Sequence, residues 1–174
     1  MPSRKTRTHK LQNNMTKSDP ETHHRRSIRI PGSDYSKAGA YYITIVSQGR
    51  ECLFGQVVGG EMKLSRFGKT VQYAWLDLPK HYPYIELDAF CIMPNHVHAI
   101  IILNNDGSHP LSEILRALKS FSAQRINTIR KTTGAPVWQR NYYEHVIRNE
   151  DDLHRIREYI VNNVLKWEDD EYYK

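Results

Sequence analysis

The spacing of hydrophobic and polar positions along the chain changes several times, and each change predicts a new secondary-structure element. The segment AYYITIVS at residues 40–47 is dense in β-branched and aromatic residues, which is typical of a strand. Two shorter segments flank Gly59 and Gly60, a dipeptide that favours a tight hairpin turn. The strands predicted on these grounds span residues 40–47, 52–58, 61–65, 84–93, 95–103 and 137–148.

Three other segments show the helical period. In residues 67–78 the apolar positions recur at helical spacing, and Pro79 predicts the end of that helix. The same spacing predicts a helix over residues 112–130, and acidic residues at 150–152 favour the start of a last helix that runs to about Leu165. Strands interspersed with a few helices predict an α+β fold, with helices packed on one face of a mainly antiparallel sheet.

Composition restricts the class of protein. Hydrophobic residues make up 39% of the 174 positions and charged residues 25%, which excludes a wholly disordered chain. No apolar run reaches the roughly 18–20 residues that span a bilayer, and the basic start lacks the apolar segment of a secretory signal. The cysteines, Cys52 and Cys91, form no CxxC pair, which indicates a reducing compartment and neither a disulfide framework nor a zinc ribbon.

The net charge of +6 is concentrated at the amino-terminal end. Residues 1–26 carry seven lysines or arginines against two acidic residues and show no hydrophobic period, so we expect a disordered basic arm there. Such an arm serves equally well as a solubilising end or as a nucleic-acid-binding segment. We expect a single folded domain over residues 27–167, followed by an acidic tail at 168–174.

The sequence His96-Val97-His98 is the sharpest local feature. Alternate side chains of a strand project from the same face, so we expect both imidazoles side by side at the entry of the predicted strand 95–103. Apolar residues follow on both faces, which predicts a central strand that is covered on both sides. Two buried imidazoles are costly unless they are hydrogen-bonded or bind a metal, and the pair alone leaves both explanations open.

The last predicted helix supplies further polar candidates. Tyr159 lies beside the apolar stripe of this helix, and Asn163 follows one turn later on the same flank. A tyrosine and an amide placed in this way can both reach a site on the neighbouring sheet. A tyrosine at such a boundary also serves as a packing residue, so the spacing allows a site without requiring one.

Taken together, these residues resemble the single-tyrosine HUH transposases, and most closely their REP-associated tyrosine transposase branch. The segments that carry the resemblance are IMPNHVH at 92–98, VWQRNYYEHVIRN at 137–149, YIVNN at 159–163, RSIRIPG at 26–32 and YYIT at 41–44. The resemblance implies a ferredoxin-like (RRM-like) α+β fold: an antiparallel sheet with helices on one face, an inserted β-hairpin and a carboxy-terminal catalytic helix.

The resemblance also implies an activity and roles for individual residues. His96 and His98 correspond to the pair that holds a divalent metal, Mg²⁺ or Mn²⁺. Tyr159 corresponds to the nucleophile, and Asn163 to the polar residue that completes the metal shell. The implied enzyme is a metal-dependent single-strand DNA endonuclease and strand transferase with a covalent 5′-phosphotyrosine intermediate. Val164 replaces the proline usual in the branch, so we expect the last helix to continue past Asn163.

The implied partner is single-stranded or hairpin-forming palindromic DNA, bound by a cytoplasmic, nucleoid-associated monomer or homodimer with no membrane partner. A net charge of +4 over residues 111–131 predicts a phosphate-binding surface, and neighbouring aromatic residues can stack on bases. The candidate DNA-binding residues are Arg116, Lys119, Arg125, Arg130, Lys131, Tyr142, Tyr143 and His145. Two alternatives stay open: a non-catalytic nucleic-acid-binding module on the same scaffold, and a metal-dependent RNA nuclease.

Overall fold

The computed structural model describes residues 38–104 and 109–173. The predicted basic arm at 1–26 lies outside the described residues. Among the helices that are described, none combines the length and the apolar character needed to cross a membrane.

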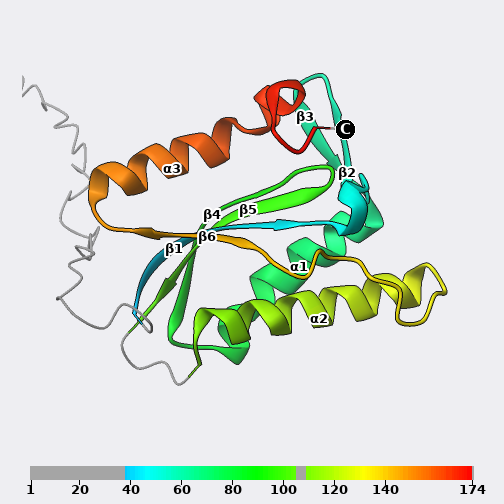
Figure 1. The fold of residues 1–174 in the computed structure, drawn as a ribbon, viewed down its shortest axis with the longest axis horizontal. Helices are drawn as coiled ribbons and strands as arrows, with labels where there is room; N and C mark the ends of the chain where they lie inside the picture. The colour runs from blue at the N-terminus through cyan, green and yellow to red at the C-terminus, as the bar shows by residue number, and fades with distance from the viewer. Residues whose placement is uncertain (1–37, 105–108, 174) are drawn as a thin grey trace, which may run out of the picture.

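An antiparallel sheet of four strands forms the centre of the molecule (Figure 1). The strands are β1 (Gly39–Val46), β4 (Ile85–Ile92), β5 (His96–Leu103) and β6 (Tyr143–Ile147). They lie in the order β4–β5–β1–β6, so β5 and β1 occupy the middle. This central pair is in register along its full length, from Gly39 opposite Leu103 to Val46 opposite His96.

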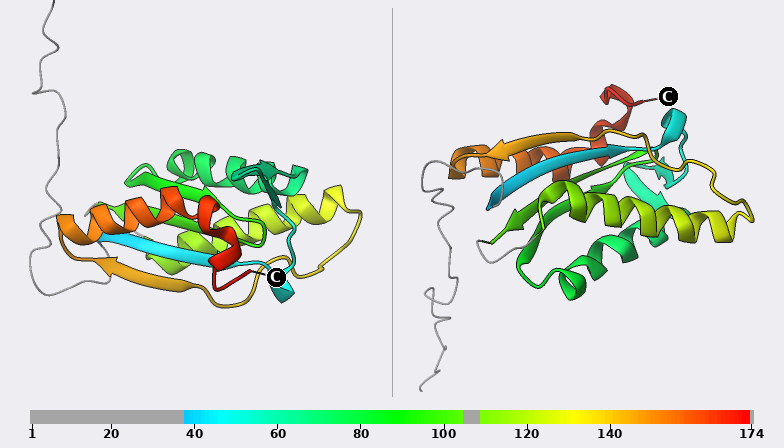
Figure 2. Two further views of the ribbon diagram at one scale, coloured as in Figure 1. Left: turned by 90° about the horizontal axis from the view of Figure 1, so that it is seen from above. Right: turned by 60° about the horizontal axis from the view of Figure 1, so that its bottom comes forward.

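Helices cover both faces of this sheet. The helices are α1 (Arg66–His81), α2 (Leu111–Ile129) and α3 (Glu150–Asn162). α1 and α2 pack on one face, and α3 lies across the other (Figures 1 and 2). The alternation along β5 explains the two layers: Val97 and Ile101 enter the core under α1 and α2, whereas Ile100 enters a smaller core under α3. The predicted antiparallel α+β fold is confirmed, including the burial of both faces of this strand, but the helices pack on both faces of the sheet and not on one, because α3 lies opposite α1 and α2.

The predicted hairpin around Gly59 and Gly60 is present. Its strands, β2 (Gly55–Val58) and β3 (Glu61–Leu64), pair with each other apart from the main sheet. Both turn glycines have positive φ angles, 60° and 77°, as a two-residue hairpin turn requires. The turn lies beside the carboxy-terminal segment, because Gly60 approaches the side chain of Leu165.

Helix α1 begins close against the chain that precedes β2. The hydroxyl of Ser65 caps the helix by accepting hydrogen bonds from the backbone N–H groups of Phe67 and Gly68. A β-carbon added at Gly68 would lie 2.1 Å from the carbonyl oxygen of Phe54. The absence of a side chain at Gly68 therefore allows the helix to approach this backbone.

Pro79 does not end α1, so this sequence prediction is wrong. The residue lies inside the last turn, and the helix continues to His81. A proline removes its own N–H donor, but three residues later the amide of Tyr82 still donates to the carbonyl of Leu78 and closes the last turn. In a final turn the loss of one hydrogen bond is not enough to stop the helix.

β6 is shorter than the predicted strand 137–148. Only Tyr143–Ile147 joins the sheet as a strand. Upstream, the ammonium group of Lys119 on α2 donates to the backbone carbonyls of Gln139 and Arg140. These bonds hold residues 139–140 against α2, and the chain just before them meets the sheet only at an isolated bridge between Trp138 and Ser47, after the end of β1.

α3 is also shorter than predicted. It ends at Asn162 instead of near Leu165, and a 3₁₀ segment, η3 (Val164–Asp169), follows directly. The chain does stay helical past Asn163, as the missing proline predicts, but in the tighter 3₁₀ form. A second 3₁₀ turn, η2 (Gln48–Arg50), follows β1.

Candidate active site

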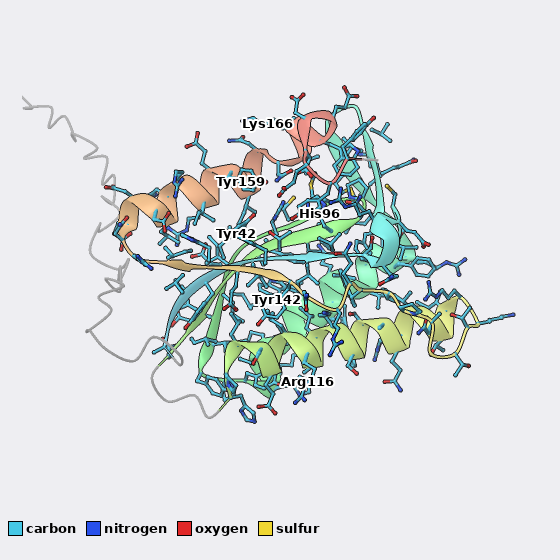
Figure 3. All side chains as sticks on the ribbon, viewed as in Figure 1. Tyr42, His96, Arg116, Tyr142, Tyr159 and Lys166 are labelled. Atoms are coloured by element: carbon cyan, nitrogen blue, oxygen red, sulfur yellow. The ribbon has the colours of Figure 1, made fainter. Side chains whose placement is uncertain are left out.

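β5 carries the two predicted imidazoles to the face of the sheet that α3 covers, where His98 contacts the ring of Tyr159 and where Figure 3 labels His96. His96 and His98 are 0% and 1% exposed, and their Nε2 atoms lie 2.9 Å apart. Two nitrogen ligands in adjacent positions around one cation are about 3 Å apart when each metal–nitrogen bond is about 2.1 Å. The separation of these atoms therefore suits two ligands of a single ion.

Asn95 fixes the orientation of the His96 ring. Its side-chain amide donates to the backbone carbonyls of Tyr172 and Arg50, at 2.7 and 3.2 Å, so Oδ1 is the atom that faces the ring. Nδ1 of His96 donates to this oxygen at 2.8 Å. The proton of neutral His96 is thereby held on Nδ1, and the lone pair of Nε2 is available to a metal.

Two hydroxyl groups on β1 do the same for His98. Thr44 Oγ1 lies 2.9 Å and Tyr42 Oη 2.8 Å from Nδ1 of His98, and Thr44 donates to Tyr42 at 3.1 Å. Because the Thr44 proton is directed to Tyr42, the Thr44 oxygen accepts from the N–H of His98. Nε2 of this ring is therefore also left with a free lone pair.

Burial keeps both rings neutral. It lowers the pKa of His96 to about 2, with additional repulsion from His98, and it lowers the pKa of His98 to about 3. The unprotonated imidazole is the form that binds metals. At neutral pH the pair is therefore already in its ligand form.

Asp170 is a further candidate ligand, which the sequence analysis does not identify. Its Oδ2 atom lies 3.8 Å from Nε2 of His96, and one ligand atom from each of Asp170, His96 and His98 lies within 4.8 Å of the others. The segment expected to form an acidic tail folds back over the site, where the ring of Tyr172 lies 4.7 Å from that of His96. Burial raises the pKa of the Asp170 carboxyl.

Asn163, the predicted third ligand, is buried beside this cluster. It is 2% exposed, and within the described residues neither atom of its side-chain amide has a hydrogen-bond partner of good geometry. Burial raises the pKa of Tyr159 and of Asp170, and the nearby Asn163 amide acts in the opposite direction on both. A buried amide without a partner is costly, and a cation would give its oxygen one. The donor set of two imidazoles, a carboxylate and this amide fits a divalent ion.

α3 directs Tyr159 toward the same point (Figure 3). Its ring lies edge-on to His98, with ring centres 5.3 Å apart. Tyr159 is 44% exposed, which leaves room for a substrate to reach it. Burial of the rest of the side chain, together with the Asp170 carboxylate, raises the pKa of the phenol. The structure thus brings together the predicted Tyr159, His96, His98 and Asn163, with the phenol protonated at neutral pH.

A charged contact anchors α3 in addition to its apolar stripe. The guanidinium group of Arg157 donates to both carboxylate oxygens of Asp88 on β4, one of these bonds being 2.9 Å long. Asp88 lies in a β-bulge, where the register of β4 against β5 shifts between Leu87 and Phe90. The helix that carries Tyr159 is therefore tied to the edge of the sheet.

Comparison with known proteins places this site in a family. Residues 78–163 match the family described as "Transposase IS200 like". The chain is 39% identical over 176 residues to an uncharacterised protein of Haemophilus influenzae (strain ATCC 51907 / DSM 11121 / KW20 / Rd), across 91% of this chain and 98% of that protein. A candidate REP-associated tyrosine transposase of the same strain is 29% identical over 140 residues, across 76% of this chain and 74% of that protein. Residues 78–163, which include both histidines and Tyr159, therefore form an IS200-like transposase domain.

Solved structures share the fold of this transposase. A REP-associated tyrosine transposase bound to a REP hairpin superposes with a TM-score of 0.58 at 22% identity, across 79% of this chain and 73% of that one. A candidate transposase from Deinococcus radiodurans R1 gives a TM-score of 0.50 at 20% identity, across 76% and 96% of the two chains. The predicted family resemblance is confirmed, and the chain is a DNA-processing enzyme by family.

The transposase places several predicted DNA-binding residues on the far side of the sheet from the histidine pair (Figure 3). Arg116, Lys119 and Tyr142 line an open pocket of about 470 Å³ between α2 and the segment before β6. Lys119 is already bonded to two backbone carbonyls, and burial lowers its pKa. Arg116 and Tyr142 remain the better placed of the three for a ligand in this pocket.

The other candidates are dispersed over the transposase. Arg130 donates to the carbonyls of Ala135 and Pro136, so it closes the loop after α2. The Arg125 guanidinium lies over two aromatic rings of the helices, 4.7 and 5.3 Å from their centres. Lys131 follows α2 with a φ of 56°. None of these three side chains lies at the histidine pair.

The two candidates on β6 lie nearer to α3. Nε2 of His145 lies 2.8 Å from Oδ2 of Asp152, at the start of α3, so the structure does not bring this ring to the histidine pair. Tyr143 is 55% exposed at the sheet edge, with its ring 6.0 Å from that of Tyr42. The ring of Tyr42 in turn lies 6.2 Å from that of Tyr159, so Tyr143 is on the same side of the sheet as Tyr159.

Metal binding to the transposase is expected to raise its melting temperature. A ligand present at 100 times its Kd stabilises the folded state by about 2.7 kcal/mol, which corresponds to about 5–10 °C for a domain of this size. Thermal unfolding with and without Mn²⁺ measures this shift, and EDTA should reverse it. The double variant His96→Ala/His98→Ala serves as the control and should show no shift. Equal melting temperatures of wild type with and without Mn²⁺ or Mg²⁺ would contradict a metal site here.

Proposed function

We propose that this transposase is a metal-dependent single-strand DNA endonuclease and strand transferase that acts through a covalent 5′-phosphotyrosine at Tyr159. The observation that carries the proposal is the convergence of an accessible tyrosine with two buried, neutral imidazoles. A phenol with a reference pKa of about 10 is a weak nucleophile at neutral pH. It needs an activated phosphate beside it, and the neighbouring ligand set supports such activation.

His96 and His98 would hold the ion, with Asp170 and Asn163 available to complete its shell. A mixed nitrogen and oxygen donor set suits Mg²⁺ or Mn²⁺. When bound, the ion polarises the scissile phosphate and stabilises the charge that develops on it. The neutral imidazoles keep the site free of a competing positive charge of their own.

Tyr159 supplies the covalent step. Its Oη atom forms a bond to phosphorus as the phenolic proton leaves to solvent, and the bond from phosphorus to the 3′ oxygen breaks. This oxygen takes up a proton and leaves as a free 3′-hydroxyl, while the 5′ side stays linked to Tyr159. One phosphodiester is exchanged for another, so attack by a 3′-hydroxyl on the adduct rejoins a strand without ATP.

Single-stranded or hairpin DNA is the proposed substrate. A solved structure with the same fold is bound to a REP hairpin, and the α2 surface of this chain is basic. We infer that Arg116 and Tyr142 contact the hairpin through their pocket and that Tyr143 guides the strand toward Tyr159. Arg125, Arg130, Lys131 and the basic arm would add salt-sensitive affinity for DNA. The transposase would work at the nucleoid, as a monomer or as a homodimer.

Adduct formation tests this function. Hairpin oligonucleotides with either a 5′ or a 3′ label are incubated with the full chain and Mn²⁺, then denatured and separated from free DNA. We expect a covalent protein–DNA adduct that carries only the label on the 3′ side of the cut, and no adduct in EDTA. Tight hairpin binding without an adduct in any divalent ion would instead support the non-catalytic binding module. An adduct with RNA but not with DNA would support the nuclease alternative.

A further inference from the structure

Two polar contacts hold α3 to the two outer strands of the sheet. On one flank of the helix, Arg157 donates to both carboxylate oxygens of Asp88 on β4. On the other flank, Oδ2 of Asp152 lies 2.8 Å from Nε2 of His145 on β6. β4 and β6 are the first and last strands in the order β4–β5–β1–β6. The helix is therefore fastened at both edges of the sheet that it covers (Figure 1).

We propose that Asp88 and Arg157 are positioning residues that fix the rotation of α3 about its own axis, and thereby the place of the Tyr159 hydroxyl beside the histidine pair. Both residues act through the helix, since Arg157 is bonded to β4 whereas the ring of Tyr159 contacts His98 on β5. The inference rests on the proposed function, because it assigns the ion pair to the reaction of Tyr159.

The apolar packing of α3 defines this rotation only loosely. The buried residues of the helix are Leu153, Ile156 and Ile160, which form a narrow stripe against the smaller core. Burial of apolar surface is non-directional, so a small turn of the helix about such a stripe costs little free energy. At about 100° per residue, Arg157 and Tyr159 lie on opposite flanks of the stripe. A contact that fixes Arg157 in place therefore also fixes the position of Tyr159.

The geometry of the ion pair suits this role. A planar guanidinium group that donates two bonds to one carboxylate is fixed in orientation as well as in distance. The carboxylate is held in turn by its own strand, because Oδ1 of Asp88 accepts from the backbone N–H of Ala89 at 2.6 Å and from Nε of Arg157 at 2.9 Å. The side chains of Asp88 and Arg157 are 15% and 39% exposed, so the pair is partly shielded from water.

Single-turnover adduct formation by the full chain, at saturating Mn²⁺ and saturating hairpin, tests the inference. Asp88→Asn and Arg157→Gln each break the ion pair, and each should slow adduct formation about 10–100-fold, the usual cost of misplacing a reacting group by about 1 Å. The two substitutions change the net charge in opposite directions, so altered attraction to DNA cannot explain a rate loss that they share. The double variant should be within about two-fold of the slower single variant, because both changes remove the same contact.

Arg155→Gln is the matched control for Arg157→Gln. Arg155 lies on the same helix, is 76% exposed, and makes its ion pair within the helix, with Asp152. The substitution removes the same charge but leaves the contact between α3 and β4 in place. Its adduct rate at saturation should stay within about two-fold of wild type, and its hairpin Kd should match that of Arg157→Gln within about two-fold.

Thermal unfolding shows whether the variants keep the fold and the metal site. The rise in melting temperature that Mn²⁺ produces should be the same in Asp88→Asn, Arg157→Gln and wild type, because both histidines lie on β5 and not on α3. Loss of this rise in either variant would overturn the inference, since the ion pair would then support the metal site itself. Adduct rates equal to wild type, or a rate loss shared by Arg155→Gln, would overturn it and leave the proposed function intact. Failure of the wild type to form an adduct would overturn both.

Discussion

Tyr159→Phe is expected to abolish the covalent protein–DNA adduct while leaving hairpin binding within about two-fold of wild type. The change removes the single oxygen that forms the bond to phosphorus and keeps the ring that packs beside His98. Loss of the nucleophile cannot be offset by the rest of the site, because a ligand set can activate a phosphate but cannot replace the attacking atom. Denaturing gels of labelled hairpin measure the adduct, and filter binding at fixed salt measures the affinity.

Tyr172 provides the sharpest control for this experiment. Its ring also lies beside the histidine pair, and burial, with Glu171 nearby, raises the pKa of its phenol to about 12. If proximity to the imidazoles were enough, Tyr172 could serve as the nucleophile. We expect Tyr172→Phe to retain the adduct and Tyr159→Phe to lose it. The reverse pattern, or a full adduct yield from Tyr159→Phe, would show that the nucleophile has been assigned to the wrong residue.

Gly68→Ala is expected to destabilise the fold by about 3 kcal/mol or more. In most helix interiors the same change stabilises by about 1 kcal/mol, because alanine is the better helix former. Here the added β-carbon would lie 2.1 Å from the carbonyl oxygen of Phe54, and backbone atoms cannot move aside as a flexible side chain can. For a domain of this size the loss corresponds to a fall in melting temperature of about 6–12 °C, measured by thermal unfolding.

Lys69→Ala is the matched control for Gly68→Ala. Lys69 is the next residue of α1 and is exposed. An alanine there should change the free energy of unfolding by no more than about 0.5 kcal/mol. If Gly68→Ala proved as stable as Lys69→Ala, the close approach of α1 to the backbone of Phe54 would be wrong.

The sequence predicts those elements of the fold in which the spacing of hydrophobic residues is clearly that of a strand or clearly that of a helix. Alternation along 95–103 predicts a central strand with the two imidazoles on one face, and the structure has this strand as β5. The helical flank shared by Tyr159 and Asn163 predicts their approach to the sheet, which the structure also shows. Element ends are predicted less well, as Pro79 and the short β6 demonstrate, because capping and tertiary hydrogen bonds decide them.

The contributions of Asp170 and Tyr42 could not be predicted in the same way. Asp170 is one of four consecutive acidic residues, at 168–171, and nothing local distinguishes it from its neighbours. Its direction is set by the fold of the following chain, whose Tyr172 carbonyl is bonded by the amide of Asn95. Tyr42 belongs to an apolar strand segment where a tyrosine is an ordinary packing residue. Its contact with Tyr159 depends on the distance between β1 and α3, which no sequence period encodes.

The β-bulge at Asp88 makes the packing of the main core independent of the contact between β4 and α3. In a regular strand, strict alternation couples the side chains of the two faces. Leu87 and Phe90 both face the α1 core although three positions apart, because one additional residue is accommodated between them. The additional residue gives the face under α3 two side chains in place of one. Ala89 packs into the smaller core under α3, and Asp88 accepts hydrogen bonds from Arg157. Deletion of Asp88 would restore regular alternation along β4 and keep the main core. It would, however, remove the contact with Arg157 that anchors α3. The position of Tyr159 relative to the sheet can therefore change while the scaffold is kept.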